Sequence, residues 1–139
     1  MPCHQETINV RTPGPGFVDI TDEVCRTVAE AGLGIALCTV FVQHTSASLV
    51  VQENADPAVL RDLSAWMEDL VSRARRWEHS AEGPDDMPAH VRSALTATSL
   101  SVPVVGGRLA LGTWQAIYLW EHRDRPHVRR CVVHVAGTG

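Results

Sequence analysis

Alternating apolar and polar positions predict that β-strands make up much of this chain. Most of these segments are bounded by glycine, proline or other turn residues, as strands in antiparallel sheets usually are. Gly106 and Gly107 separate two of them, and adjacent glycines readily supply the positive φ angles of a two-residue hairpin turn. The expected strands cover residues 6–10, 17–20, 35–44, 100–105, 108–111, 114–121 and 129–135.

Apolar residues recurring every three or four positions predict helices between some of these strands. The first begins near Thr21 and ends at Gly32, because the segment opens with capping and acidic residues and closes with glycine. The second begins after Asp56, a good N-cap, with Pro57 at the first helical position. Its apolar residues continue to Ala74 and form the stripe of a core-facing helix.

A third, short helix is predicted around Pro88, with Asp86 or Met87 as its cap and an end near residue 98. This assignment places His90 in the first helical turn. Strands outnumber helices, and tight turns join several neighbours. The pattern therefore favours an α+β fold with mostly antiparallel sheets over a doubly wound α/β fold.

Composition narrows the class of protein. A length of 139 residues predicts one domain spanning residues 1–139, and 45% apolar with 20% charged residues is typical of a soluble globular protein. No apolar run is long enough to cross a bilayer and no signal peptide is recognisable, so we expect a cytoplasmic protein that does not bind membranes. The net charge of −4 argues against nucleic-acid binding. The four cysteines are scattered, which predicts free thiols.

The densest group of candidate ligands lies in residues 79–90, which include the stretch EGPDDMPAH. Imidazole nitrogens and carboxylate oxygens are the groups that zinc and similar ions prefer. The spacing does not match a single-helix zinc motif, so surface or hydrogen-bonded roles for these side chains are an equal alternative. The residues concerned are His79, Glu82, Asp85, Asp86 and His90.

Two further constellations suggest binding. His44, Thr45 and Ser46 follow an apolar strand, where loops on a rigid scaffold often carry function, although a simple Ser/Thr turn explains them equally well. Arginines surround Pro126 and are suited to holding carboxylate or phosphate groups, with surface ion pairs as the alternative. The chain has no lysine, which excludes a Schiff-base mechanism.

Three motifs closely resemble those of the YjbQ family: HTSASLVVQENADP (44–57), WEHSAEGPDDMPAH (77–90) and SLSVPVVGGRLALGTWQAIYLWEHR (99–123). The resemblance runs from about residue 39 to the carboxyl terminus and is looser before that. It implies a two-sheet α+β sandwich, mostly antiparallel and flanked by helices, that assembles as a homotrimer. Members of the family are often described as secondary thiamine-phosphate synthases, after a side activity that condenses a pyrimidine pyrophosphate with a thiazole phosphate.

The resemblance also implies that the polar residues of the motifs gather in one pocket. On this basis we expect catalytic roles for His44, Asp86 and Glu121. We expect a divalent metal ion, with zinc as one candidate, to be held by His79, His90 and His122. The expected substrate-binding residues are Thr45, Ser46, Asn54, Thr113, Gln115 and Arg129.

The hypothesis that follows is a metal-assisted enzyme acting on a small phosphorylated or heterocyclic substrate. A non-catalytic trimer that binds a metal or a metabolite is the alternative. In a third reading, the same histidines and carboxylates form buried networks between the subunits of a structural trimer.

Overall fold

The computed structural model describes residues 1–139, which form two antiparallel β-sheets and three helices. The helices are α1 (Thr21–Ala31), α2 (Pro57–Leu70) and α3 (Asp86–Leu95). The strands are β1 (Cys3–Thr12), β2 (Gly16–Asp19), β3 (Ile35–Val42), β4 (Ala47–Glu53), β5 (Ser99–Val105), β6 (Arg108–Leu109), β7 (Gln115–Glu121) and β8 (His127–Thr138). The α+β class and the mostly antiparallel pairing predicted from the sequence are confirmed.

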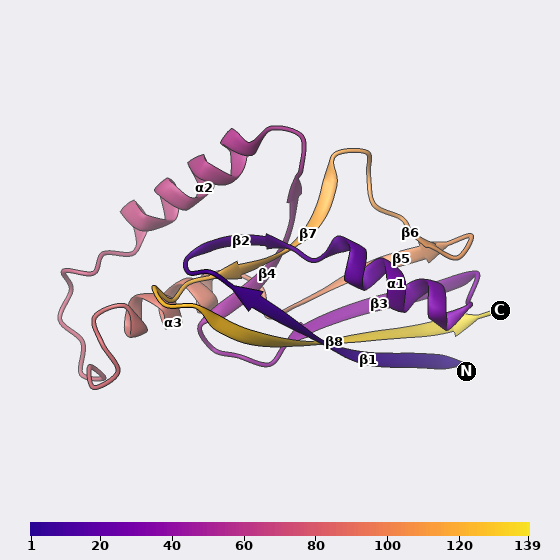
Figure 1. Ribbon diagram of the computed structural model, residues 1–139, viewed down its shortest axis with the longest axis horizontal. Coiled ribbons are helices and arrows are strands. Elements are labelled where there is room, and N and C mark those ends of the chain that lie inside the picture. The colour runs from indigo at the N-terminus through magenta and orange to yellow at the C-terminus, as the bar shows by residue number, and fades with distance from the viewer.

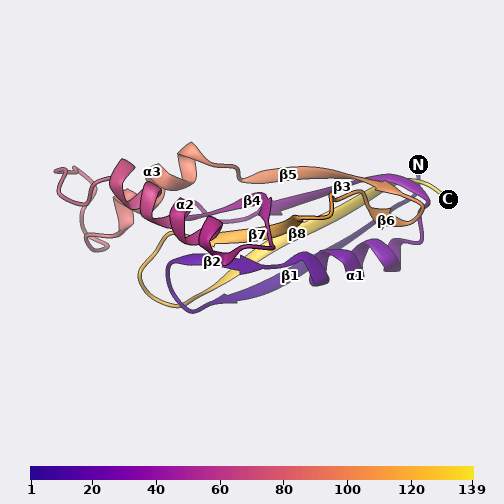
Figure 2. The same ribbon diagram turned by 90° about the horizontal axis from the view of Figure 1, so that it is seen from above.

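The two sheets lie in layers (Figures 1 and 2). The larger sheet has the strand order β1-β8-β3-β5-β6, and the smaller has the order β2-β7-β4. The smaller sheet and α1 together cover one face of the larger sheet, while α2 and α3 lie at the opposite end from the two chain termini. A core of 17 buried apolar residues joins the layers, with contributions from both sheets and α1.

The predicted capping signals operate where the sequence placed them. Helix α1 begins at Thr21 and ends at Gly32, whose φ of 65° lies in the left-handed region that glycine adopts freely. The Asp56 carboxylate accepts a hydrogen bond of 2.9 Å from the Ala58 N–H at the start of α2. Gly106 and Gly107 also have positive φ angles, 58° and 79°, and form the predicted hairpin turn between β5 and β6.

Three local features differ from the sequence prediction. Helix α2 does not face the core along its length, because Met67 is its only buried residue and the helix ends at Leu70. Strand β4 was not predicted, since its first three residues are buried in succession instead of alternating. Helix α3 begins at Asp86 and ends at Leu95. Its N-cap residue is Asp85, which makes no side-chain capping bond. The carboxylate of Asp86 is therefore free for other contacts.

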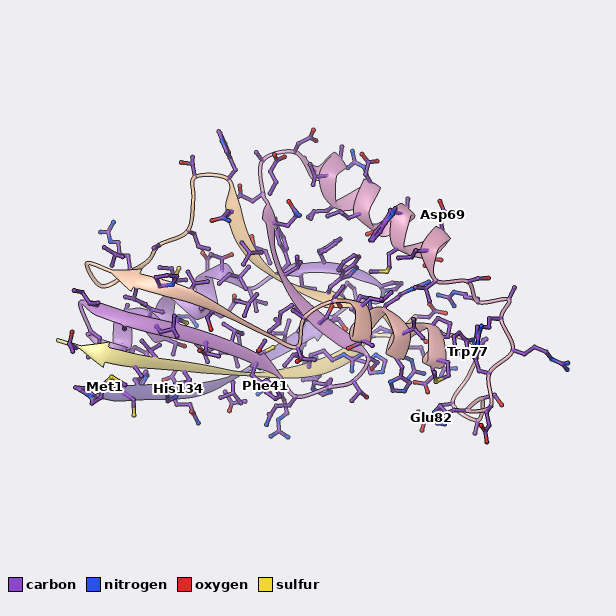
Figure 3. All side chains as sticks on the ribbon, turned by 180° about the vertical axis from the view of Figure 1, so that it is seen from behind. Met1, Phe41, Asp69, Trp77, Glu82 and His134 are labelled. Carbon is purple, nitrogen blue, oxygen red and sulfur yellow. The ribbon has the colours of Figure 1, made fainter.

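The outer face of the larger sheet is not covered by any element of the chain. Alternation along β3 places Ile35, Leu37 and Phe41 on this face, and the pairing of Ile35 with Val105 extends the apolar surface to β5. Ile35 is 71% exposed and Val105 64% exposed. Figure 3 shows Phe41 and His134 projecting from this side of the sheet. No helix combines the length and apolar character needed to cross a membrane.

Gly137 provides a test of the packing between β3 and β8. A Cβ atom at this position would overlap with the carbonyl oxygen of Ile35 and the Cα of Ala36, both backbone atoms that cannot rotate away. We expect Gly137→Ala to lower the free energy of unfolding by about 3 kcal/mol, the upper end for overpacking. Urea denaturation measures this loss. Gly139→Ala is the control, because nothing lies within 4 Å of its added Cβ, and equal stability of the two variants would contradict the packing described.

Candidate functional site

The candidate site is built where the smaller sheet meets α3. Ala47 at the start of β4 pairs with Glu121 at the end of β7, so the residues before Ala47 and after Glu121 leave the sheet together. The N–H of His122 donates to the carbonyl of Ser46 at 3.3 Å. Ser93 of α3 donates from its hydroxyl to the carbonyl of Ala47 at 3.1 Å, which fixes the helix against this end of the sheet.

Three predicted residues form a compact cluster here. His79 Nε2 lies 2.8 Å from Asp86 Oδ2, and His90 Nε2 lies 3.2 Å from the same oxygen. The three candidate ligand atoms are all within 4.8 Å of one another. Asp86 is only 2% exposed at its side chain, whereas His79 is 51% and His90 31% exposed. The histidine–aspartate cluster, defined as His79, Asp86 and His90, therefore has a buried carboxylate beneath two accessible imidazoles.

The orientation of His90 is fixed by the loop that follows β3. His90 Nδ1 lies 3.0 Å from the carbonyl oxygen of Thr45, which can only accept a hydrogen bond, so Nδ1 carries the proton. In the neutral form of the ring, which has one N–H, Nε2 then directs a lone pair at Asp86 Oδ2. Two lone pairs at that distance repel each other, and a proton or a metal cation between them removes the repulsion.

Arg123 and Asp85 hold the cluster in place. Arg123 Nη1 lies 3.1 Å from Asp86 Oδ1, and its Nε donates to Asp85 Oδ2 at 2.9 Å. A third guanidinium nitrogen donates to the carbonyl of Glu82 at 3.0 Å, which ties down the loop before α3. Burial alone would raise the pKa of Asp85, but the bonds from Arg123 and from the Asp124 N–H outweigh it and lower that pKa to about 2.

Glu121 and Arg129 form a buried ion pair beside the cluster. Arg129 donates to both carboxylate oxygens of Glu121 and to the hydroxyl and carbonyl oxygens of Ser46. Thr12 donates to Glu121 at 2.7 Å. Burial would raise the pKa of Glu121, but the bonds from Arg129 and Thr12 outweigh it and keep that pKa below its ordinary value. These bonds already occupy three predicted site residues: Glu121, expected to be catalytic, and Ser46 and Arg129, expected to bind substrate.

His122 does not join the histidine–aspartate cluster. It is fully buried, with Nε2 2.9 Å from Ser48 Oγ and its ring 5.2 Å from that of Trp120. Burial lowers the pKa of His122 to about 4, and the nearby Arg92 guanidinium adds to the effect. The structure thus gives Asp86 a place among the candidate ligands and gives His122 an interior position.

His44 also makes a backbone contact instead of a contact with the cluster. Its Nε2 accepts a hydrogen bond of 2.8 Å from the N–H of Arg130. Burial and the nearby Arg129 both lower the pKa of His44, which favours the neutral ring. Its neighbour Thr45 contacts the cluster through the backbone carbonyl described above. This loop therefore positions His90 and does not bring the His44 ring to the cluster.

The remaining predicted residues lie at the other end of the smaller sheet. Glu53, at the end of β4, pairs with Gln115, and the next residue, Asn54, bonds through its N–H to the carbonyl of Trp114. The Gln115 side chain accepts from the N–H of Gly112 and closes its own loop, next to the exposed Thr113. The seven residues of β4 put about 20 Å between this group and the cluster. One chain therefore does not gather all the motif residues in a single pocket.

Sequence reasoning missed two contributors. Thr12 reaches Glu121 although 109 residues separate them in sequence. Ser48 reaches His122 from the neighbouring strand β4. No local pattern marks either residue, because both contacts depend on how strands distant in the sequence come together.

The fold and this site define a small two-layer α+β protein with an accessible histidine–carboxylate cluster at one end. The model of the family described as "UPF0047 protein YjbQ-like" matches residues 6–138, so the chain belongs to the YjbQ/UPF0047 family. The resemblance inferred from the motifs is confirmed, and it extends to the first strands.

Curated relatives and solved structures agree with this assignment. The UPF0047 protein sll1880 of Synechocystis is 54% identical over 135 residues, covering 96% of this chain and 92% of that protein. YjbQ of Escherichia coli is 39% identical, with 96% and 98% covered. An uncharacterised YjbQ/UPF0047 protein of Clostridium acetobutylicum superposes with a TM-score of 0.87 at 32% identity, covering 94% of this chain and 99% of that one.

The buried imidazole of His122 makes stability depend on pH. Its pKa of about 4 in the folded chain lies below the ordinary value of about 6.5, so between these pH values the unfolded chain binds a proton that the folded chain does not. This stabilisation is complete above about pH 6.5 and is lost as the pH falls toward 4, a change of about 3 kcal/mol. We expect His122→Asn to flatten that part of the pH profile of unfolding, measured by urea titration. Arg61→Gln, which changes an exposed side chain on α2, should leave the profile as it is. A profile identical in wild type and His122→Asn would show that His122 titrates normally.

Proposed function

We propose that this protein binds a divalent cation through His79, Asp86 and His90 and uses it to act on a small phosphorylated substrate. Zinc is a suitable ion, because two imidazoles and one carboxylate are a known catalytic ligand set that leaves a fourth position for water or substrate. In this assignment Asp86 is a direct ligand, and the Thr45 carbonyl and Arg123 orient the ligands from outside, as partners of metal ligands commonly do.

The observation that supports this proposal is the orientation of His90. Its Nδ1 proton is committed to the carbonyl of Thr45, and its Nε2 faces the carboxylate of Asp86. A buried carboxylate facing an imidazole lone pair is unfavourable, and a divalent cation bound by both groups relieves it. The exposure of His79 and His90 leaves the fourth coordination position open to solvent.

The local charge favours an anionic substrate once a cation is bound. Asp85 and Asp86 contribute two negative charges and Arg123 one positive charge, so the group carries one net negative charge with neutral histidines. A divalent cation reverses the sign and attracts phosphate. Because Arg123 and Arg129 are already paired with carboxylates, the open metal position is the main electrophilic group available to a phosphate.

The family's thiamine-phosphate synthase side activity is compatible with such a site. In that reaction a carbon–nitrogen bond forms between the thiazole nitrogen and the methylene carbon of the pyrimidine, and the bond from that carbon to the pyrophosphate oxygen breaks. A cation held by His79, Asp86 and His90 would supply charge neutralisation for the departing pyrophosphate. The chain's own residues position the two ligand imidazoles and shield the carboxylate of Asp86 from water.

Metal binding and turnover test the proposal together. We expect His79→Ala/His90→Ala to bind one Zn²⁺ fewer per chain than wild type, measured by calorimetric titration, and to lose metal-dependent turnover of the pyrimidine pyrophosphate with the thiazole phosphate. Binding should weaken as the pH falls, because ligand imidazoles must be deprotonated.

Glu78→Ala is the matched control, since it removes an exposed ionisable side chain next to His79 that is not part of the cluster. It should bind and turn over like wild type. If the double variant keeps the wild-type stoichiometry and affinity for Zn²⁺, the cluster is not a metal site and the proposal fails.

A non-catalytic binding protein is the second candidate, and one observation favours it. The groups predicted to be catalytic beside the metal, His44 and Glu121, are both hydrogen-bonded within the chain. Zn²⁺ binding at the cluster, together with thermal stabilisation by phosphorylated metabolites and no turnover, would identify this alternative.

We also propose that the chain assembles as a homotrimer through the outer face of the larger sheet. The family resemblance supplies the threefold arrangement, and the support from the chain is the apolar surface formed by Ile35, Leu37, Phe41 and Val105. These side chains lie on either side of the polar residues Thr39, Ser101 and His134, and exposed apolar side chains gathered on one sheet face are typical of a surface that a partner covers.

Light scattering after gel filtration tests the assembly. Wild type should have three times the 15.2 kDa chain mass. We expect Leu37→Glu/Phe41→Glu to run as a monomer, because each carboxylate would be buried without a partner. Trp114→Glu, a change at an exposed side chain on another loop, should remain trimeric. An unchanged mass for the double variant would show that this face is not the interface.

A further inference from the structure

A second group of candidate metal ligands lies at the opposite end of the molecule. His4 and Glu6 are two residues apart on β1, so their side chains share one face of the strand. Glu30 comes from the last turn of α1, which packs against β1. Figure 1 shows this end of β1 and α1 beside the two chain termini, far from α3. These three residues are called the His4 cluster, and their candidate ligand atoms all lie within 4.8 Å of one another.

The distances in the His4 cluster are those of metal ligands. His4 Nε2 lies 3.4 Å from Glu6 Oε1 and 3.7 Å from Glu30 Oε2. A charge-assisted hydrogen bond between these groups would be about 2.7–2.9 Å long. Ligand atoms about 2.0–2.1 Å from a tetrahedral zinc ion are separated by about 3.3 Å. Both distances are thus longer than a charge-assisted hydrogen bond and close to the edge of a zinc coordination tetrahedron.

The nitrogen at the centre of this cluster has no partner. His4 Nε2 is shielded from solvent and makes no hydrogen bond. A buried polar atom without a partner costs about 1–3 kcal/mol, and such atoms are rare in native proteins. Coordination of a cation by the Nε2 lone pair removes this cost.

A hydroxyl group outside the cluster orients one of its carboxylates. Thr27 of α1 lies one helical turn before Glu30, and its hydroxyl proton is shared between Glu6 Oε2 and the carbonyl oxygen of Glu23, each 3.3 Å from Oγ1. This bond leaves Glu6 Oε1 directed at His4. Hydrogen bonds of this kind to ligating carboxylates are a regular feature of metal sites.

Charge supports the same conclusion. The cluster brings the carboxyl groups of Glu6 and Glu30 together from adjoining elements. Two carboxylates sharing a site repel each other, and a divalent cation between them neutralises the pair. One imidazole nitrogen and two carboxylate oxygens suit zinc and neighbouring first-row divalent ions, with the fourth position left for water.

We propose that His4, Glu6 and Glu30 form a second divalent-metal site, of the zinc type, that ties the start of β1 to the end of α1. It is separate from the histidine–aspartate cluster and does not depend on the function proposed for that cluster. Its effect is structural, because a cation bound only by the folded chain stabilises the fold.

The experiment uses the full chain with the other cluster removed by His79→Ala/His90→Ala. We expect this background to bind one Zn²⁺ per chain by calorimetry, and its unfolding temperature to rise when ZnCl₂ is added. Adding His4→Gln should weaken Zn²⁺ binding by more than about tenfold and remove the thermal shift. Thr27→Val should weaken binding by about tenfold, the least expected for the loss of an outer partner. Titration with Co²⁺ gives an independent readout, since its visible absorption becomes intense on entering a four-coordinate site.

His134→Gln is the matched control, because His134 lies on the outer face of the larger sheet and bonds to Gln5 instead of to a carboxylate. It should bind Zn²⁺ like the background. The proposal is overturned if the background binds no Zn²⁺, or if His4→Gln leaves its affinity unchanged while circular dichroism shows the fold intact.

Discussion

The buried ion pair between Glu121 and Arg129 holds together the end of the molecule that carries the candidate site. Glu121 belongs to β7 of the smaller sheet and Arg129 to β8 of the larger one, so the pair joins the two layers. Thr12 at the end of β1 and Ser46 before β4 complete the hydrogen bonding. Buried charges are tolerated when every partner is satisfied, and here each oxygen of the carboxylate has a donor.

The same carboxylate controls the geometry of the cluster beside it. Glu121 Oε2 also accepts from the backbone N–H groups of His122 and Arg123, at 3.1 and 3.2 Å. These bonds fix the turn after β7 and direct the Arg123 guanidinium toward Asp85 and Asp86. A series of charge-assisted bonds thus connects the interior to the surface. Glu121 influences the candidate site indirectly, as a positioning residue that acts through Arg123.

Much of the fold was predictable because its signals are local. The Asp56-Pro57 cap, the Gly32 stop and the Gly106-Gly107 turn each work through neighbouring backbone, and all were found where the sequence placed them. The nearness of His79, Asp86 and His90 was also predictable, since the three lie within one short segment. Strand β4 was missed because its first three residues are buried in succession, which removes the alternation expected of a half-buried strand.

The partners of His122, Glu121 and His44 could not be predicted, because each depends on register between distant strands. Asp86 or Met87 was expected to cap this helix because Pro88 follows them. The helix instead begins at Asp86 itself, and Arg123, which follows a distant strand, binds the Asp86 carboxylate. The hydrogen bond at His90 Nδ1 likewise involves the carbonyl oxygen of Thr45, 45 residues away in the sequence. Local chemistry identified the ligand candidates, and tertiary contacts decided which of them meet.

The order of strands in the larger sheet bears on how the chain is made. Strand β8 lies between β1 and β3, so the amino-terminal strand has no partner in that sheet until residues 127–138 exist. Pairing between segments so distant in sequence makes folding slow and leaves unpaired strand edges exposed to aggregation in the meantime. A nascent chain still lacking β8 cannot complete this sheet, so the native fold forms only after that strand is translated. Until then the chain has the greatest need of chaperones.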